Sequence, residues 1–405
     1  MDKIREKITA LSVTSKAAIE EGKIKSFDKR STEETCFRVY DGEHMGIQYI
    51  QGKCNDEDGF SKADDNLSLR RPYRFTPETG SRHRDKTETE YSDKELLDIA
   101  REALDYLGRK HPDHKILGEV SLRRETDTMT NSLGLDYSNT DCAVTVSIGF
   151  KHKDSKDIRD GWFELSMRTY DFAKFTDMAD NYLTNFTNRV ELPEELIIQQ
   201  QYYGYLGKFY DLLNAENIAL GTSLFSGRIG EKIFADDLTV INNVSDEETW
   251  FTTFFDGEGV VNPGDTRVFI ENGVLLSGFS DKYTADKYGV PHTGNAGFNM
   301  SDIPRPGHLA LQIKRSEKTV KELLGGRLTV VPVIASGGGF NEKGDYVTPV
   351  QTALLCDGER FLGRLPEFAI KGNIFDMLGK DFIGVGSDDP VFNDKQILMR
   401  MELSK

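Results

Sequence analysis

Basic residues are in short supply in this sequence. The chain has 405 residues, with 51 Lys and Arg against 67 Asp and Glu, and its formal net charge is −16. Proteins that bind the phosphate backbone of nucleic acids need clustered Lys and Arg side chains. We therefore predict no nucleic-acid partner for this protein.

Long apolar runs and paired cysteines are missing as well. No apolar stretch approaches the roughly 18 residues of a membrane span, and the opening MDKIREKITALSVTSK lacks the apolar core of a signal peptide. Cys36, Cys54, Cys142 and Cys356 are scattered and form no C-x-x-C pair, which is typical of reduced thiols. We expect a cytoplasmic protein without membrane contact.

The residue patterns present predict an α+β fold in two domains. The first domain is expected over residues 1–190 and the second, strand-rich domain over 191–405. Ile4, Ile8 and Leu11 have helical spacing and predict a helix at the start of the chain.

Within the first domain, Asp41-Gly42 predicts a hairpin, and a capping box at Ser92–Glu95 predicts the start of a helix that ends at Gly108. Alternating or apolar runs predict three strands, and an apolar pattern predicts a helix after them: strands at 116–126, 142–152 and 162–170, and a helix around 172–182. Residues 52–91 form a long polar stretch. We interpret it as an extended or mobile insertion, because it has little apolar surface to offset the entropy of ordering.

In the second domain, Pro193 predicts the first turn of a new helix. Asn272-Gly273 and Asp357-Gly358 predict hairpins, and residues 316–324 predict a helix that stops at Gly325.

Candidate catalytic and metal-binding residues are sparse. No histidine occurs between His152 and His292, and no G-x-S-x-G elbow is present. His111 and His114 flank a loop-like HPDH and are expected to be solvated rather than to bind metal, and Cys356 is expected to be half-buried rather than nucleophilic. Other isolated candidates are expected to lie in turns, loops or a strand: Ser226, Ser336, His292 and His308.

Two further features raise the question of ligand binding. Gly337-Gly338-Gly339 would let a peptide approach the backbone closely, but a hairpin loop is an equally good interpretation. An aromatic stripe begins near residue 202, and its spacing predicts one packed face. Its members are Tyr202, Tyr203, Tyr205, Phe209 and Tyr210, with Leu206 and Leu213. We keep Gly337, Gly338, Gly339, Tyr205 and Phe209 as candidates for contact with a ligand.

The most informative run lies between Gly221 and Phe298: GTSLFSGRIGEKIFADDLTV, then DGEGVVNPGDTRVFIENGVLLSGFSDKYTADKYG and HTGNAGF. It resembles the central part of the TldD/PmbA family, whose members were called modulators of DNA gyrase and are grouped with zinc metallopeptidases. Later segments, PGHLALQI and PEFAIKGNIFDMLGKDFIGVGSD, match in order. Phe298, where an arginine often stands, and the 52–91 stretch depart from the family pattern.

The resemblance also shows what is missing. Active members carry a His-Glu-x-x-x-His helix upstream of this run, but the corresponding stretch here reads QQQYYGYLGKFYDLLNAEN. They also carry a cysteine after a VGND-like segment, whereas here Val385-Gly386-Ser387-Asp388 continues without one. The resemblance therefore implies a PmbA/TldE-like chain with no zinc, no cofactor and no catalytic residues of its own.

Three functions remain open at this point. The first is a non-metal subunit that shapes a cavity for unfolded peptide, while a zinc-bearing TldD-like partner hydrolyses the peptide. Gly337, Gly338, Gly339, Tyr205 and Phe209 are then the candidates for lining that peptide cavity. The second is a homodimeric peptide-binding or scaffold protein with no proteolytic role. The third is a hydrolase with a different, unrecognised site.

Overall fold

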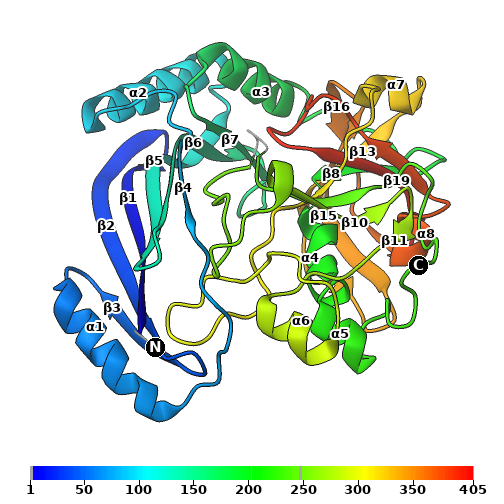
Figure 1. Ribbon diagram of the computed structural model, residues 1–405. Coiled ribbons are helices and arrows are strands. Elements are labelled where there is room, and N and C mark those ends of the chain that lie inside the picture. The colour runs from blue at the N-terminus through cyan, green and yellow to red at the C-terminus, as the bar shows by residue number, and fades with distance from the viewer. Residues whose placement is uncertain (1–2, 202, 246–248, 405) are drawn as a thin grey trace.

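The computed structural model describes residues 3–201, 203–245 and 249–404. Figure 1 shows two parts side by side, an N-terminal part built on one long curved sheet and a C-terminal part built on two sheets. Helices and strands occur in both parts, which confirms the predicted α+β fold. Within the described residues, no helix has the length and apolar character needed to cross a membrane.

The N-terminal sheet has the order β3-β2-β1-β5-β6-β4, and β7 also pairs with β6. Its strands are β1 (Ile4–Glu20), β2 (Lys23–Tyr40), β3 (Met45–Gln51), β4 (Gly80–Asp85), β5 (His114–Asn131), β6 (Leu135–His152) and β7 (Gly161–Met167). Neighbours are antiparallel except β4, which runs parallel to β6. Helices α2 (Asp93–Lys110) and α3 (Phe172–Thr184) lie over one end of the sheet, and α1 (Asp56–Asp65) lies at the other end (Figure 1).

The prediction of a helix at the start of the chain is wrong, because these residues form the strand β1. Ile8 packs in a core with Tyr40 and Met129. Ala17 and Ile19, an odd number of positions away, pack in a different core under α2. Side chains alternate between the faces of a strand, so β1 buries opposite faces at its two ends. This change of face removes the simple alternation that identifies a strand.

The prediction that residues 52–91 are extended or mobile is wrong over α1, which is helical, whereas β4 is an extended strand that pairs with β6. Asn55 caps α1 by accepting hydrogen bonds from the amides of Glu57 and Asp58. Ala63 is fully buried in a small core with Phe37 and neighbouring β2 residues. A few apolar contacts and the pairing of β4 with β6 order this polar segment.

The C-terminal part contains a four-stranded sheet, β11-β10-β9-β12, and a nine-stranded sheet, β18-β19-β8-β13-β15-β17-β20, with β14 and β16 paired to β15. The first comprises β9 (Val240–Asn243), β10 (Thr266–Glu271), β11 (Val274–Leu275) and β12 (Leu311–Ile313). The second comprises β8 (Ile197–Gln201), β13 (Thr329–Ala335), β14 (Gly339–Phe340), β15 (Asp345–Cys356), β16 (Phe361–Arg364), β17 (Phe368–Asn373), β18 (Phe382–Val385), β19 (Gln396–Arg400) and β20 (Glu402–Leu403). The helices are α4 (Tyr203–Leu212), α5 (Ala215–Leu220), α6 (Lys282–Tyr288), α7 (Val320–Leu324) and α8 (Ile374–Met377).

Local turn and cap signals in the sequence were reliable. The capping box at Ser92 and Glu95 opens α2, and hairpins form at Asp41-Gly42, Asn272-Gly273 and Asp357-Gly358. The prediction that a helix begins at Pro193 is wrong, because the next element is the strand β8.

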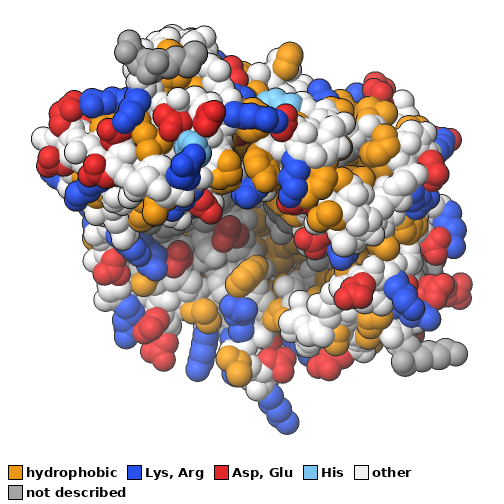
Figure 2. Space-filling view, turned by 60° about the horizontal axis from the view of Figure 1, so that its bottom comes forward, with side chains coloured by type: hydrophobic (Ala, Val, Ile, Leu, Met, Phe, Trp, Pro, Cys, Tyr) orange, Lys and Arg blue, Asp and Glu red, His pale blue; other side chains and the backbone are white. Residues whose placement is uncertain are grey.

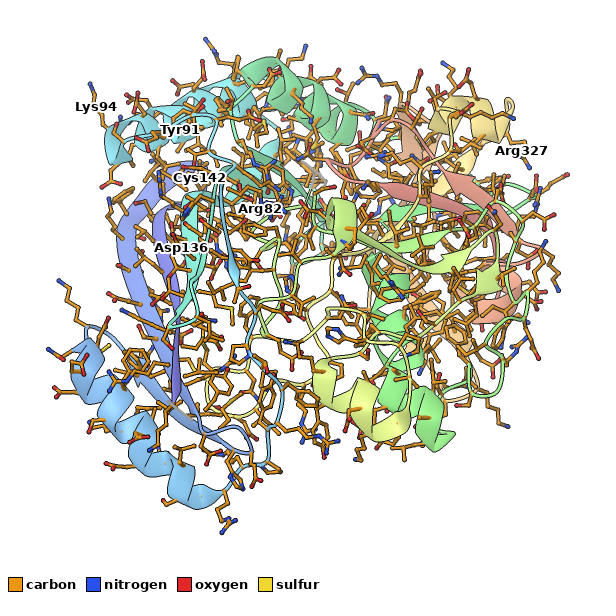
Figure 3. All side chains as sticks on the ribbon, viewed as in Figure 1. Arg82, Tyr91, Lys94, Asp136, Cys142 and Arg327 are labelled. Carbon is orange, nitrogen blue, oxygen red and sulfur yellow. The ribbon has the colours of Figure 1, made fainter. Side chains whose placement is uncertain are left out.

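The two parts share their cores. Tyr182 of α3 contacts Phe361 of β16, with ring centroids 4.9 Å apart. At the other end of the N-terminal sheet, Tyr137 lies 5.3 Å from Phe254, measured between ring centroids. Arg82 of β4, labelled in Figure 3, reaches across to Asp265 with two hydrogen bonds of 2.6 and 2.5 Å. The domain boundary near residue 190 stays a prediction, since apolar packing continues across it.

Candidate functional site

The aromatic stripe of α4 forms part of the C-terminal core. Tyr205, Leu206 and Phe209 are 2%, 2% and 0% exposed, and Leu213 is fully buried, as the predicted packed face requires. The prediction is wrong for Tyr210, which is 42% exposed. The Tyr205 hydroxyl donates a hydrogen bond of 2.9 Å to Gln200. Tyr202 and the side chain of Tyr203 lie outside the described residues. Neither Tyr205 nor Phe209 presents surface to a peptide in this conformation.

The glycine run is exposed and is separated from β13 by Ser336. Gly337 has a φ of +89°, which other residues rarely adopt. A Cβ atom at Gly338 would lie 2.0 Å from the carbonyl oxygen of Val347. Close packing against β15 therefore accounts for one glycine, and contact of Gly337, Gly338 and Gly339 with a peptide remains a prediction.

The isolated candidates are explained by local structure. The prediction that His111 is solvated is wrong, because His111 is buried with Nε2 2.7 Å from a carboxylate oxygen of Asp180. Cys356 is fully buried, and burial raises the pKa of its thiol to about 12, so it is a poor nucleophile at neutral pH. Ser336 is exposed between β13 and Gly337.

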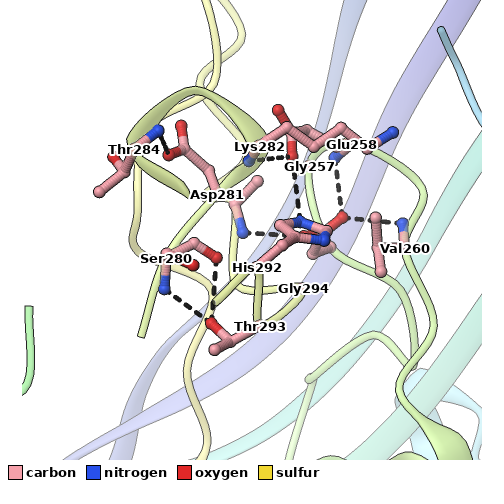
Figure 4. A network of polar contacts seen from close by, with 12 residues as sticks. Gly257, Glu258, Val260, Ser280, Asp281, Lys282, Thr284, His292, Thr293 and Gly294 are labelled. Atoms are coloured by element: carbon pink, nitrogen blue, oxygen red, sulfur yellow. Dashed lines mark hydrogen bonds and ion pairs between the residues drawn. The ribbon is translucent and has the colours of Figure 1, made fainter. Parts of the chain in front are cut away.

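One group of side chains in the described residues has the spacing of metal ligands. Oxygen atoms of Asp256 and Glu258 and a ring nitrogen of His292 all lie within 4.8 Å of one another (Figure 4). The two carboxylates are 1% and 3% exposed, whereas the side chain of His292 is 31% exposed. All three residues belong to the DGEG and HTGN segments of the central run.

Asp256 joins its own loop to the segment that contains Ala296. One carboxylate oxygen accepts hydrogen bonds from the amides of Glu258 and Val260, both 2.9 Å long. The other accepts one from the amide of Ala296 at 2.8 Å. Burial and the neighbouring Glu258 charge together raise the pKa of the Asp256 carboxyl to about 7, although the three backbone amides lower it.

Glu258 is bonded on both oxygens too. Tyr73 donates a hydrogen bond of 2.7 Å to Oε1. The backbone amide of Lys282 donates one of 3.0 Å to Oε2 (Figure 4). Nε2 of His292 lies 3.7 Å from Oε2. Each oxygen of the two carboxylates already accepts a hydrogen bond from the chain. The group of Asp256, Glu258 and His292, with Tyr73 bonded to it, therefore fits a structural role better than that of an open metal site. We call this group the joint, because it holds separate segments of the chain together.

A second buried network connects this joint to the N-terminal sheet. Arg38 of β2 donates to Glu6 at 3.2 Å and to the carbonyl of Gly257 at 2.7 Å. Tyr40 donates to the same Glu6 oxygen at 2.6 Å. Arg38 and Glu6 are 0% and 1% exposed. The central run is therefore fixed to β1 and β2 by buried charges.

Sequence reasoning missed this joint. Its members come from segments up to 219 residues apart, counted from Tyr73 to His292 (292 − 73). The recognisable signal was the DGEG segment within the central run, but its partners Tyr73 and Arg38 carry no motif.

Comparison with known proteins identifies the family. Residues 197–397 match the family described as PmbA/TldA metallopeptidase C-terminal domain. The chain belongs to the TldD/PmbA family. Its relatives include an uncharacterized protein of Methanocaldococcus jannaschii, 24% identical over 267 residues, and a metalloprotease of Methanothermobacter thermautotrophicus, 30% identical over 177 residues. The matches cover 64% and 43% of this chain, and 62% and 38% of those relatives, less than two thirds of either.

Solved structures show the same fold over the whole chain. TldE from Thermococcus kodakarensis superimposes with a TM-score of 0.81 at 20% identity, over 100% of this chain and 96% of TldE. A putative modulator of DNA gyrase from Thermotoga maritima superimposes with a TM-score of 0.77 at 22% identity, over 99% of this chain and 95% of that one.

The zinc of the family's peptidases does not fit the residues of this chain. A catalytic zinc takes three protein ligands such as His, Glu or Cys. The described side chains of α4 that are buried in the core are Tyr205, Leu206, Phe209 and Leu212. No cysteine follows Cys356 in the sequence.

Proposed function

We propose that this protein is the PmbA/TldE-like, non-metal subunit of a TldD/PmbA-type peptidase system. It would shape a cavity for unfolded peptide, and a zinc-bearing TldD-like partner would hydrolyse that peptide. The observation that carries the proposal is α4, where a core of tyrosine, leucine and phenylalanine stands in place of zinc ligands within an otherwise complete family fold.

The shape and charge of the surface support a role in holding peptide. Figure 2 shows a hollow near the centre of one face, with acidic side chains inside it. The net charge of −16 would favour peptides that carry basic residues. As part of the proposal we place the protein in the cytoplasm, because its four cysteines are free thiols.

Metal analysis and reconstitution test the proposal together. We expect the purified chain to contain no stoichiometric zinc and to cleave no peptide alone. Mixed with a TldD-like subunit that carries the His-Glu-x-x-x-His motif, it should form a stable complex that cleaves unfolded peptide faster than that subunit alone.

The control replaces the two histidines of the partner's motif with alanine, which should abolish cleavage while the complex still forms. One tightly bound zinc per chain, or zinc-dependent cleavage by this chain alone, would contradict the proposal. If native mass spectrometry shows a stable homodimer that does not bind the TldD-like subunit, the result would instead favour a homodimeric peptide-binding or scaffold protein.

A further inference from the structure

Two strand edges remain open where the two parts of the molecule meet. β7 pairs only with β6 among the described strands. β13 pairs with β15 on one side, and on its other side it pairs with β8 only at Val330. The open edges approach each other at Gly161, where a Cβ atom would lie 3.0 Å from Cγ1 of Val333.

A cavity of about 290 Å³ opens beside this approach. Its wall combines both open strands with the end of β8, two residues of α3 and a loop before β19. The residues that matter most are Trp162 and Glu164 of β7, Val333 and Ala335 of β13, Gln200 of β8, and Phe392. Beyond the cavity the β7 edge is closed, because the Asn393 side chain donates a hydrogen bond of 2.5 Å to the carbonyl of Ser166.

The chemistry of this wall matches an extended peptide. Open strand edges present unpaired backbone donors and acceptors that an added strand can satisfy. Trp162 is 54% exposed, with the Arg159 guanidinium 4.7 Å from its ring, and it offers an apolar surface to a side chain of the added strand.

Glu164 supplies a charge that selects the occupant. It is exposed on the same face of β7 as Trp162 and forms no ion pair with any described residue. The cavity volume lies near the lower limit of about 300 Å³ for ligand pockets, so only a short run of residues enters.

We propose that this cavity binds an extended peptide segment by strand addition to β7 or β13, with an aliphatic side chain against Trp162 and a Lys or Arg side chain at Glu164. The inference rests on the proposed function for the origin of the peptide. The glycine run begins two residues after Ala335, so the hairpin that it forms lies at one end of the cavity.

Fluorescence of the full chain provides a direct test. Trp162 and Trp250 are the only tryptophans, so a Trp250→Phe variant reports on Trp162 alone. The probe is an acetylated, amidated peptide of sequence Lys-Val-Leu-Val-Lys, titrated to about 1 mM, where weak complexes are still detected. We expect a saturable change in emission, and slower hydrogen exchange in β7 and β13.

Two altered probes separate strand addition from non-specific binding. Methylation of alternate backbone nitrogens removes the donors of the peptide, and we expect affinity to fall about tenfold or more. Replacement of both Lys residues by Glu should weaken binding about fivefold, and a Glu164→Lys variant should reverse this preference.

Hydrogen exchange of matched variants, titrated with the same peptide, measures affinity and localises the site. Trp162→Ala should lower affinity about tenfold, whereas Leu220→Ala, which removes an apolar side chain that is 59% exposed elsewhere, should leave it unchanged. Thermal melts establish that each variant folds, and the methylated peptide tests the idea without any substitution.

Absence of saturable binding, equal binding of the methylated peptide, or no effect of Trp162→Ala would overturn the inference. These results are distinguishable from failure of the proposed function, which concerns complex formation and cleavage with a TldD-like subunit. If this chain with Trp162→Ala and a TldD-like subunit together cleave peptide as well as the unaltered pair, the proposed function would stand. The cavity would then have no part in it.

Discussion

Arg38 of β2 contacts residues of both parts of the molecule. Its guanidinium is fully buried, pairs with Glu6 and donates to the carbonyl of Gly257. Burial, together with the Glu6 charge, raises the pKa of Tyr40 well above its ordinary value, so Tyr40 remains a neutral donor to Glu6. Removal of Arg38 leaves a buried carboxylate without a counter-charge.

We predict that Arg38→Met lowers the free energy of unfolding by about 3–5 kcal/mol, the usual cost of breaking one side of a buried ion pair. Urea denaturation followed by circular dichroism measures it. Lys321→Met is the control, because Lys321 pairs with Glu359 on the surface and both side chains are about half exposed. Its cost should be about 0–1 kcal/mol, and equal costs for the two variants would show that the Arg38 network contributes little.

At the scale of elements, two helical glycines offer a matched test of packing. In α1, a Cβ atom at Gly59 would lie 2.3 Å from the Phe37 ring, whereas in α2 nothing lies within 4 Å of a Cβ atom at Gly108. Gly59→Ala should destabilise the protein by about 1–3 kcal/mol through overpacking. Gly108→Ala should stabilise it by about 0.4–1 kcal/mol, because alanine loses less backbone entropy on folding.

Thermal and urea unfolding of the two alanine variants measure these effects. Stabilisation by both substitutions would mean that α1 does not pack on β2 as described, and that the polar segment 52–91 is loosely held after all.

The same elements show which features could be predicted from sequence. Caps and two-residue turns depend on neighbouring residues, so the start of α2 and three hairpins were predicted correctly. β1 was not, because it buries Ile8 on one face and Ala17 on the other, and that depends on which elements cover each end of the sheet.

The candidate site shows the same division. The packed face of α4 was predicted from spacing within a few residues, and its Tyr205 and Phe209 are buried. The joint of Asp256, Glu258 and Tyr73 was not, because the fold brings together segments that have no local signal for one another. The cavity beside β7 and β13 depends on the approach of strands from both parts, which sequence patterns did not reveal.

At the scale of the whole molecule, the shared cores bear on how the protein unfolds. Tyr182 packs against Phe361, and Phe254 packs against Tyr137, so each part completes its core with residues of the other. We predict a single cooperative transition in calorimetry, with equal calorimetric and van't Hoff enthalpies. A fragment of residues 1–190 should lack near-ultraviolet circular dichroism, because it leaves those apolar surfaces exposed.

Two separate calorimetric peaks, or a natively folded 1–190 fragment, would instead support independent domains divided near residue 190. A Phe361→Ala variant also distinguishes one cooperative unit from two independent domains. In one cooperative unit it should lower the temperature of the single transition, whereas in independent domains it would lower only that of the C-terminal part.

The contact between Gly161 and Val333 has a mechanical consequence. It is a point where strands from the two parts meet without hydrogen-bond pairing, so a small tilt of one part against the other widens or narrows the space beside it. A peptide bound in that space would favour one orientation of the two parts over others. By thermodynamic reciprocity, a second subunit that fixes this orientation would change the affinity for the bound peptide.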